Sequence, residues 1–533
     1  MVISHFMKPE TPKAYLIGGG IASLAAAAYL IRDGNFAGKN IYIFEEGKDL
    51  GGSLDGQGSP DTGYVIRGIR MLSDEIYNCT FDLLSFIPLN NNSNNYEPNK
   101  TLLDDFNDFN KEIKVKAKAR LVQNKKIIDS ANFGLSMIEV AKIIKIISLP
   151  ESLLRNSMIS DHFSTSFFET NFWLEWCTTF SFQPWHSAVE FRRYILRFIQ
   201  DFPELNTMTV VRQTRYNQHD SIILPLTNWL KKHNVNFITE SKVTTLEFIG
   251  NSDEERVGKI NFRQKEQEQN ITPDENDLVF FTNGSITAGS TFGSMTSAPI
   301  LNTDNLNSSW ALWKNIADGR PHFGNPEVFC NQDQVDKTRW VSFSITFRDQ
   351  TFTDLMEKFS KNKVGTGGLT TFKDSNWLLS VVTPPQPHFI NQPSNIYVLW
   401  GYGLSPDQIG NYVSKKMLDC TGTEILTEIC SHLGFTENLP AILKSADCVP
   451  CLMPYITSQF MPRRKKDRPA VVPRNTKNFA FIGQFCEIPN EITFTIEQSV
   501  RSAMIAVRKL LGIKKAIPPI YKGSNAKEII RDS

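Results

Sequence analysis

A strand, a glycine-rich turn, an alanine-rich helix and a second strand ending in an acid succeed one another within residues 14–45. AYLI at 14–17 predicts a short buried strand, and the helix is expected over 21–31, closed by Asp33-Gly34. Between them, the turn at 18–23 (GGGIAS) has the GxGxxS pattern, whose glycines let backbone N–H groups approach a pyrophosphate. This order predicts a dinucleotide cradle, and its expected contacts are Gly18, Gly20, Ala22 and Ser23.

An acid and a second glycine pair strengthen this prediction. The strand expected at 41–44 delivers Glu45 at the spacing where a carboxylate accepts the two hydroxyls of an adenosine ribose. Gly51-Gly52-Ser53 follows at once, and we expect Gly52 and Ser53 to contact the cofactor. An ordinary strand-turn-helix, in which glycines only permit tight packing, explains neither feature.

Three later segments return to the same fold. Residues 241–264 alternate like strands, and DLVFFT at 277–282 predicts a buried strand that ends in Asn283-Gly284-Ser285. A strand at 479–482 ends at Gly483, and Thr495 begins a capped helix whose N-terminus would point main-chain donors at a flavin ring. Asn283, Ser285, Gly483 and Thr495 are therefore further candidate cofactor contacts.

The chain is expected to be an α/β protein with a Rossmann-like domain assembled from discontinuous segments and a largely helical and mixed α+β substrate-binding region. The nucleotide-binding segments are 1–90, 205–300 and 470–512, and the polar run at 90–95 (NNNSNN) marks the first boundary. The remaining segments are a helical, aromatic-rich insertion at 91–204, a substrate-binding domain at 301–469 and a tail at 513–533. Twelve aromatic residues between 161 and 200 indicate either an apolar cavity or a plain aromatic core.

Composition excludes several classes of function. Net charge is +1, with 57 basic and 56 acidic residues, so nucleic-acid binding is not expected. The eight cysteines are scattered and the first thirteen residues lack an apolar core, which predicts a reducing cytoplasm. Cys448 and Cys451 have no second pair to complete a metal site, and none is expected. The tail mixes basic and apolar residues, which suits either peripheral membrane contact or a frayed terminus.

With these motifs in hand, the chain resembles the oleate hydratases, the FAD-dependent fatty-acid hydratases once called myosin-cross-reactive antigens. The resemblance runs nearly end to end and rests on AYLIGGGIASLAAAAYLIRDG, GGSLDG, NFWLEWCTTFSFQPWHSAVEFRRYILRF, TRYNQHDSIILPL, VFFTNGSIT, FGNPEVFC, QPHF, MPYITSQFMPR and NFAFIGQF. It implies FAD in a structural or electrostatic role, a long buried tunnel, and addition of water to the cis double bond of a long-chain unsaturated fatty acid. Many members are homodimers, although nothing in this chain marks an interface.

The resemblance also assigns the proton donor. Hydration of an unactivated alkene needs an acid on one face and a positioned water on the other. By resemblance the acid is Tyr194, in Arg192-Arg193-Tyr194. A free tyrosine has a pKa near 10, so donation calls for a site that stabilises the phenolate, and the two adjacent arginines are the candidates.

The chain departs from its family at the position of the water-activating carboxylate. Many members read RGGRE, whereas this chain reads Arg67-Gly68-Ile69-Arg70-Met71, so Met71 stands where the glutamate would be. In this it resembles a subgroup of the family that carries methionine at this position. Arg70 remains a candidate cofactor contact. A general base contributes roughly 10²- to 10⁴-fold, so its loss should slow the reaction rather than abolish it. Asp74 and Glu75 are candidate substitutes, unless they are merely exposed loop carboxylates.

A second departure concerns the fatty-acid carboxylate. Members often place a threonine and a small polar residue before QPHF, where this chain has Val382 and Pro384. Gln218 matches another tunnel residue, and His388 either meets the carboxylate or serves structure. Three hypotheses therefore remain: a hydratase, a flavin-dependent oxidoreductase acting on an apolar substrate, and a fatty-acid-binding homologue with weak or no hydratase activity.

Overall fold

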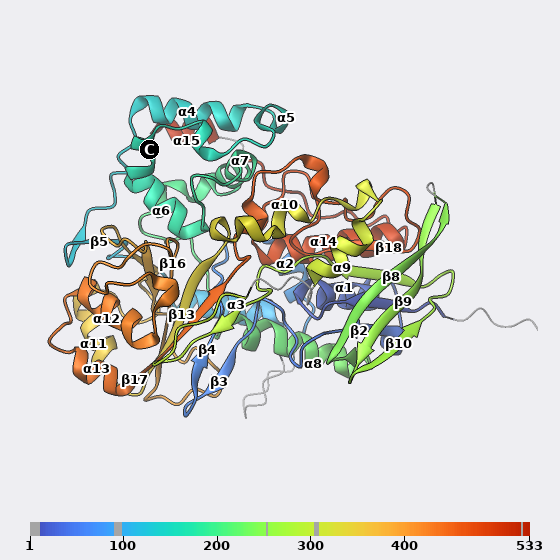
Figure 1. The fold of residues 1–533 in the computed structure, drawn as a ribbon, viewed down its shortest axis with the longest axis horizontal. Coiled ribbons are helices and arrows are strands. Elements are labelled where there is room, and N and C mark those ends of the chain that lie inside the picture. The colour runs from blue at the N-terminus through green and yellow to red at the C-terminus, as the bar shows by residue number, and fades with distance from the viewer. Residues whose placement is uncertain (1–10, 90–98, 252–253, 303–308, 524–525, 533) are drawn as a thin grey trace, which may run out of the picture.

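The computed structural model describes residues 11–89, 99–251, 254–302, 309–523 and 526–532. At its centre is a five-stranded parallel sheet in the order β18-β11-β1-β2-β7 (Figure 1). In that order the strands are β18 Phe479–Ile482, β11 Leu278–Thr282, β1 Ala14–Ile17, β2 Ile41–Phe44 and β7 Asn236–Ile238. The four strands expected here from the sequence are confirmed, and the fifth was not foreseen. The polar run at 90–95 lies outside the described residues.

Helices bury this sheet. All residues of β1 and β18 are buried, and because side chains alternate along a strand, both faces of the sheet must be covered. The covering helices include α1 Ile21–Arg32, α2 Asn78–Leu84, α8 Leu224–Lys232 and α14 Ile496–Leu510. Helix α1 ends one residue later than expected, and the small side chains of its alanines at 25–28 are fully buried where it packs against α14 and α8.

Two smaller antiparallel sheets flank the centre. Residues 241–251 and 254–264 form strands as predicted, and they pair with a third strand on the right of Figure 1. Residues 252–253 of the predicted segment lie outside the described residues. The three are β8 Ser241–Asn251, β9 Glu254–Gln264 and β10 Gln267–Ile271. The other small sheet is the hairpin of β3 Gln57–Ser59 and β4 Gly63–Val65.

A second large sheet of eight strands has the order β12-β17-β13-β16-β15-β14-β5-β6, with only β14 and β5 parallel. Its strands are β12 Thr291–Phe292, β17 Ala446–Met453, β13 Trp340–Phe347, β16 Tyr397–Gly403, β15 Leu379–Val382, β14 Leu369–Phe372, β5 Leu121–Gln123 and β6 Lys126–Ile128. One face packs on α11 Thr351–Ser360, α12 Gly422–Leu433 and α13 Leu439–Ser445. The opposite face presents large aromatic side chains to the interior of the molecule.

Cys448 and Cys451 both lie on β17 and are buried free thiols. They belong to different hydrophobic clusters, on opposite sides of the sheet, because positions three apart on a strand face opposite ways.

A helical layer lies at the top of Figure 1 and contains α4 to α7. The α-helices not yet given, those that were not named with the two large sheets, are α3 Leu102–Glu112, α4 Met137–Ser148, α5 Glu151–Leu154, α6 Asn171–Phe180, α7 Ala188–Arg197, α9 Ser309–Ala317, α10 Glu327–Cys330 and α15 Ala526–Asp532. Thr170 and Ser187 cap α6 and α7 by accepting hydrogen bonds from backbone N–H groups of the first turn, which fixes where these helices begin.

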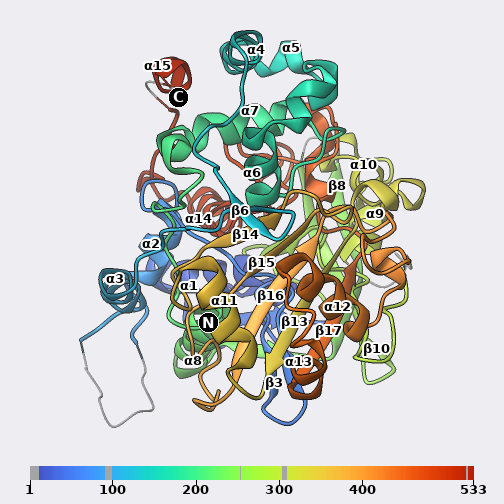
Figure 2. The same cartoon turned by 90° about the vertical axis from the view of Figure 1, so that its left-hand side faces the viewer.

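The tail packs on this layer instead of fraying. Helix α15 lies beside α4 (Figure 2) and contacts the 3-10 helix Ile199–Glu204, with Ala526 and Ile530 buried. The expectation of a frayed terminus was therefore wrong for residues 526–532. Among the described residues, every helix is too short or too polar to cross a membrane.

Candidate active site

The glycine turns enclose a cavity of about 340 Å³, here called the cradle cavity. The turn after β1 and the pair Gly51-Gly52 are in contact, since the Gly51 N–H donates to the Gly19 carbonyl at 3.0 Å. Gly20 has extended backbone, and a Cβ built there would meet only the Gly52 Cα, at 3.9 Å. A side chain on Gly20 would therefore fit the protein but project into the space beside the second turn.

The chemistry of this cavity fits a dinucleotide. Gly20 is the N-cap of α1 and has no side chain to cap the helix, and the first turn carries no acid, so the N–H groups there are free for an anion. Glu45 lies at the end of β2, where its carboxylate accepts hydrogen bonds from the Gly19 N–H at 2.7 Å and the Gly47 N–H at 2.8 Å. The backbone thus holds the acid at the cavity wall.

Most candidate cofactor residues line the cradle cavity, namely Gly18, Gly20, Ala22, Glu45, Gly52, Ser53, Ser285 and Gly483. Two others lie behind the wall. The Ser23 hydroxyl is within 3.2 Å of the Thr282 hydroxyl, and the Asn283 amide donates to the Phe485 carbonyl. Arg70 and Thr495, the remaining two, line a different cavity.

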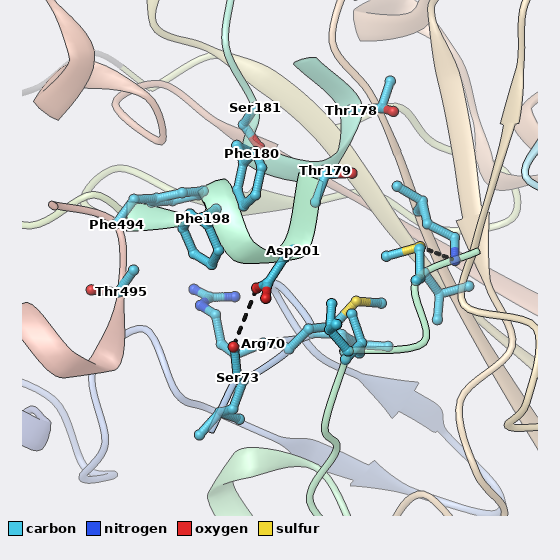
Figure 3. Close-up of a pocket in the computed structure, with 18 of the residues that line it drawn as sticks. Arg70, Ser73, Thr178, Thr179, Phe180, Ser181, Phe198, Asp201, Phe494 and Thr495 are labelled. Carbon is cyan, nitrogen blue, oxygen red and sulfur yellow. Dashed lines mark hydrogen bonds between the residues drawn. The ribbon is translucent and has the colours of Figure 1, made fainter. Parts of the chain in front are cut away.

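That second cavity, of about 150 Å³ and here called the apolar cavity, lies between the helical layer and the eight-stranded sheet. Its walls are mostly apolar and aromatic, and they include Phe180, Tyr194, Phe198, Trp340, Val382, Trp400, Tyr402 and Phe494. Figure 3 shows part of this lining, with Phe180, Phe198 and Phe494 close together. The aromatic-rich segment thus does both things that its composition allowed, since other rings of it, such as Phe167, Phe172 and Trp176, form a packed core.

The two cavities adjoin each other. The Arg70 guanidinium is 3.5 Å from the Ser53 carbonyl, and Gln484 donates to the Thr495 carbonyl at 2.7 Å. Ser53 and Gln484 line the cradle cavity, whereas Arg70 and Thr495 line the apolar cavity. Burial lowers the pKa of Arg70 to about 10, so its guanidinium is still charged at neutral pH. A positive charge therefore stands where the cavities meet.

Tyr194 lines the apolar cavity from α7, is only 1% exposed, and donates a hydrogen bond to the Thr493 carbonyl. Burial raises its pKa well above the usual 10, and the neighbouring Tyr77 adds to the rise. The phenol is accordingly neutral, with its proton in place, at any pH near 7.

The arginines beside Tyr194 do not stabilise its phenolate, contrary to expectation. Arg192 donates to the Leu149 carbonyl, and Arg193 pairs with Glu151 and with Glu487 at 2.8 Å. Residues adjacent on a helix point in different directions, so these two arginine side chains meet other partners than the Tyr194 hydroxyl. The cation that lowers the pKa of Tyr194 is instead Arg468, far away in the sequence and buried.

Glu487 holds this arginine cluster together. Burial alone would raise the pKa of its carboxyl, but Arg463, Arg193 and Arg468 outweigh that and lower the pKa to about 2. Arg463 and Arg193 both lie within 2.8 Å of its oxygens. The cluster ties the helical layer to the segment before α14 and so supports the wall that carries Tyr194.

We expect Glu487→Gln to destabilise the protein by about 3 kcal/mol at pH 7, because buried guanidinium groups lose their counter-charge. The depressed pKa stabilises the fold fully above the unfolded pKa of 4.5, and this stabilisation is lost as pH falls toward 2. Denaturant melts of wild type and variant across that range should converge at acid pH. A constant difference between the two proteins would contradict this account.

Met71 lines the apolar cavity, and the Tyr77 hydroxyl donates to its carbonyl at 3.3 Å. The candidate substitutes for the missing glutamate are not at this cavity. Asp74 is exposed and forms an ion pair with Arg212, while Glu75 is exposed on the same loop. The structure therefore favours the interpretation that Asp74 and Glu75 are exposed loop carboxylates over the one in which they replace the glutamate.

Of the candidate substrate residues, only Val382 lines the apolar cavity. Gln218 is buried behind it and exchanges hydrogen bonds with the backbone N–H and carbonyl of Arg70. Pro384 accepts a hydrogen bond from Gln386. His388 is buried with both ring nitrogens unpartnered, and burial lowers its pKa to about 4, so the ring is neutral at pH 7.

Several residues of the apolar cavity were not foreseen. Trp340, Trp400 and Tyr402 come from β13 and β16, and two carboxylates, Asp201 and Glu204, come from the 3-10 helix after α7. One signal was available in the sequence: Phe198 and Asp201 follow Tyr194 at helical spacing, which places all three on one face.

The parallel sheet, the glycine cradle and the adjoining cavity define a protein with a Rossmann-like fold, of the kind that binds nucleotides, and an enclosed apolar site. The chain belongs to the MCRA family, whose model matches residues 11–508. An oleate hydratase of Streptococcus pyogenes serotype M49 (strain NZ131) is 38% identical over 547 residues, with 99% of this chain and 90% of that protein covered. A linoleate hydratase of Lactiplantibacillus plantarum is 33% identical over 543 residues, with 94% of each covered.

A solved structure supports the fold independently. A triple mutant of putrescine oxidase, made to redesign its cofactor binding, superposes with a TM-score of 0.52 at 10% identity. The superposition covers 94% of this chain and 99% of that one. At this identity the likeness bears on the fold alone.

Proposed function

We propose that this protein is a fatty acid hydratase, a hydro-lyase that adds water across the cis double bond of a long-chain unsaturated fatty acid such as oleic acid. The observation that carries the proposal is Tyr194, a buried neutral phenol on the wall of an enclosed apolar cavity beside a nucleotide cradle. Relatives named oleate hydratase and linoleate hydratase, matched over almost the whole chain, support it.

FAD is the cofactor that we propose for the cradle cavity. The open N-terminus of α1 would face its pyrophosphate, and the Glu45 carboxylate would accept its ribose hydroxyls. When bound, FAD would supply a conjugated ring and local charge to the site. Addition of water transfers no net electrons, so hydration itself needs no change in flavin oxidation state.

The chain's own groups would divide the work. Aromatic and aliphatic walls hold the acyl chain and exclude bulk water, which would otherwise compete for the Tyr194 proton. Tyr194 gives its proton to one alkene carbon, and a bound water attacks the other. Arg468, and Arg70 on the cavity wall, are the cations that would offset the developing phenolate charge.

The decisive experiment is to incubate the FAD-loaded protein with a panel of free unsaturated fatty acids under anaerobic conditions. We expect products heavier by one water, detected by mass spectrometry, with no stoichiometric change in the flavin absorbance. A flavin change that matches product formation would favour the oxidoreductase hypothesis instead. Binding without any hydroxy product would favour a fatty-acid-binding homologue. Met71 and Val382, which depart from the family pattern and line the cavity, would be consistent with that outcome.

A further inference from the structure

A carboxylate that the sequence did not single out stands at the apolar cavity. Asp201 belongs to the 3-10 helix Ile199–Glu204, which follows α7 after one non-helical residue, Phe198. Tyr194, Phe198 and Asp201 lie at helical spacing and all three line the cavity. Tyr194 stands on α7 and Asp201 on the 3-10 helix, so two successive helical segments carry the two groups to one cavity.

Asp201 also reaches the wall that contains Met71. The Ser73 hydroxyl donates to an Asp201 oxygen at 3.2 Å, and Ser73, two residues after Met71, lines the same cavity (Figure 3). The Asp201 carboxylate therefore comes to the chain segment from which the family's glutamate would project. Within the described residues it forms no ion pair, so its charge is not already committed to a cation.

The protonation state of Asp201 suits proton transfer near neutral pH. Burial, opposed by the Ser73 hydrogen bond and assisted by the carboxylates of Glu75, Glu204 and Asp74, raises its pKa to about 6. A base works best when its pKa is near the working pH, since it is then ionised and still basic. Glu204, the other carboxylate at the cavity, is exposed.

We propose that Asp201 accepts the proton of the added water, in place of the glutamate that is missing at position 71. This inference rests on the proposed hydratase function. In the step, the alkene π electrons form a C–H bond with the Tyr194 proton, and the water oxygen forms a C–O bond with the neighbouring carbon. The second water proton passes to Asp201, which returns a proton through solvent to the Tyr194 phenolate. The net change is one water added.

The test compares the FAD-loaded wild type with Asp201→Asn, which keeps the shape of the side chain. We expect kcat for oleic acid to fall about 100-fold, with KM changed less than about threefold. Because the base must be ionised, the wild-type rate should rise with pH through about 6, and this acid limb should be absent from the variant. Asp74→Asn, which alters an exposed carboxylate outside the cavity, is the matched control and should keep at least half of the rate and the acid limb.

Two further variants separate catalysis from structure. Met71→Glu in the Asp201→Asn background supplies a carboxylate from the family's position and should recover about tenfold of the lost rate. Ser73→Ala removes a hydrogen bond to the ionised carboxylate and should move the acid limb to higher pH. Circular dichroism and flavin absorbance verify that each variant is folded and loaded.

The outcomes are distinct. If the wild type forms no hydroxy fatty acid, the proposed function fails and this inference fails with it. If the wild type is active and Asp201→Asn keeps its rate and its acid limb, the inference alone is overturned. An Asp201→Asn variant that is slow but keeps the acid limb, and is not rescued by Met71→Glu, would also overturn it.

Discussion

Replacing Tyr194 with phenylalanine should lower the rate of oleic acid hydration by about 10³-fold, within the range that a general acid contributes. The physical reason is that the phenol is the proposed proton donor, and phenylalanine has no proton to give. Because the Tyr194 hydroxyl hydrogen-bonds to the Thr493 carbonyl, the variant also leaves one buried acceptor unpaired, which costs about 1–3 kcal/mol of stability. Initial rates of hydroxy acid formation by mass spectrometry measure the effect.

Tyr402→Phe is the matched control. Tyr402 is also buried in the apolar cavity, and its hydroxyl likewise donates to a backbone carbonyl, that of Thr178. The chemical change and the structural cost are thus the same, so a loss caused only by packing would appear in both variants. We expect Tyr402→Phe to lose far less activity than Tyr194→Phe. Equal losses would contradict the role assigned to Tyr194.

Gly20→Val should weaken FAD binding by about 100-fold, which corresponds to about 3 kcal/mol. The added side chain would occupy the cradle cavity next to Gly52, where we propose that the FAD pyrophosphate binds. The fold should survive, because the backbone at Gly20 is extended and a Cβ meets no protein atom closer than 3.9 Å. Flavin absorbance after titration with FAD, together with thermal melts of the apoprotein, separates binding from folding.

Gly20→Ala provides a graded comparison, since it adds one methyl group at the same place and should weaken FAD binding less. If Gly20→Val binds FAD as tightly as the wild type, the cradle cavity is not the cofactor site. If the valine variant unfolds while the alanine variant binds FAD normally, the cause is steric strain within the protein. That result would contradict the prediction that a side chain at Gly20 blocks FAD without disturbing the fold.

Much of the nucleotide fold could be predicted because its signals are local. The strands at 14–17 and 41–44, the helix from Ile21 and the acid Glu45 are specified by residues close together in the sequence. Turn chemistry and the periodicity of apolar residues act over a few residues, so spacing alone identifies them. Tyr194 was also reached from the sequence, through a resemblance that the family match and the named relatives now confirm.

The electrostatic surroundings of the site were harder to predict. The sequence placed Arg192 and Arg193 beside Tyr194, but their side chains pair with the Leu149 carbonyl and with carboxylates from other segments. Arg468 and Asp201 were missed for the same reason, because a charge acts through space and its strength depends on burial. Neither distance nor burial can be read from neighbours in the chain.

By itself, the sequence predicted the glycine cradle and Glu45 as its ribose acid, since both depend on residue identity and short spacing. The candidate proton donor Tyr194 and the missing carboxylate at Met71 were predicted from the family resemblance of the sequence. Only the tertiary structure decided which side chains share the apolar cavity, and it brought Asp201 and Ser73 to the same wall as Met71. The physical reason is that cavity walls and shifted pKa values arise from desolvation and packing between segments more than a hundred residues apart.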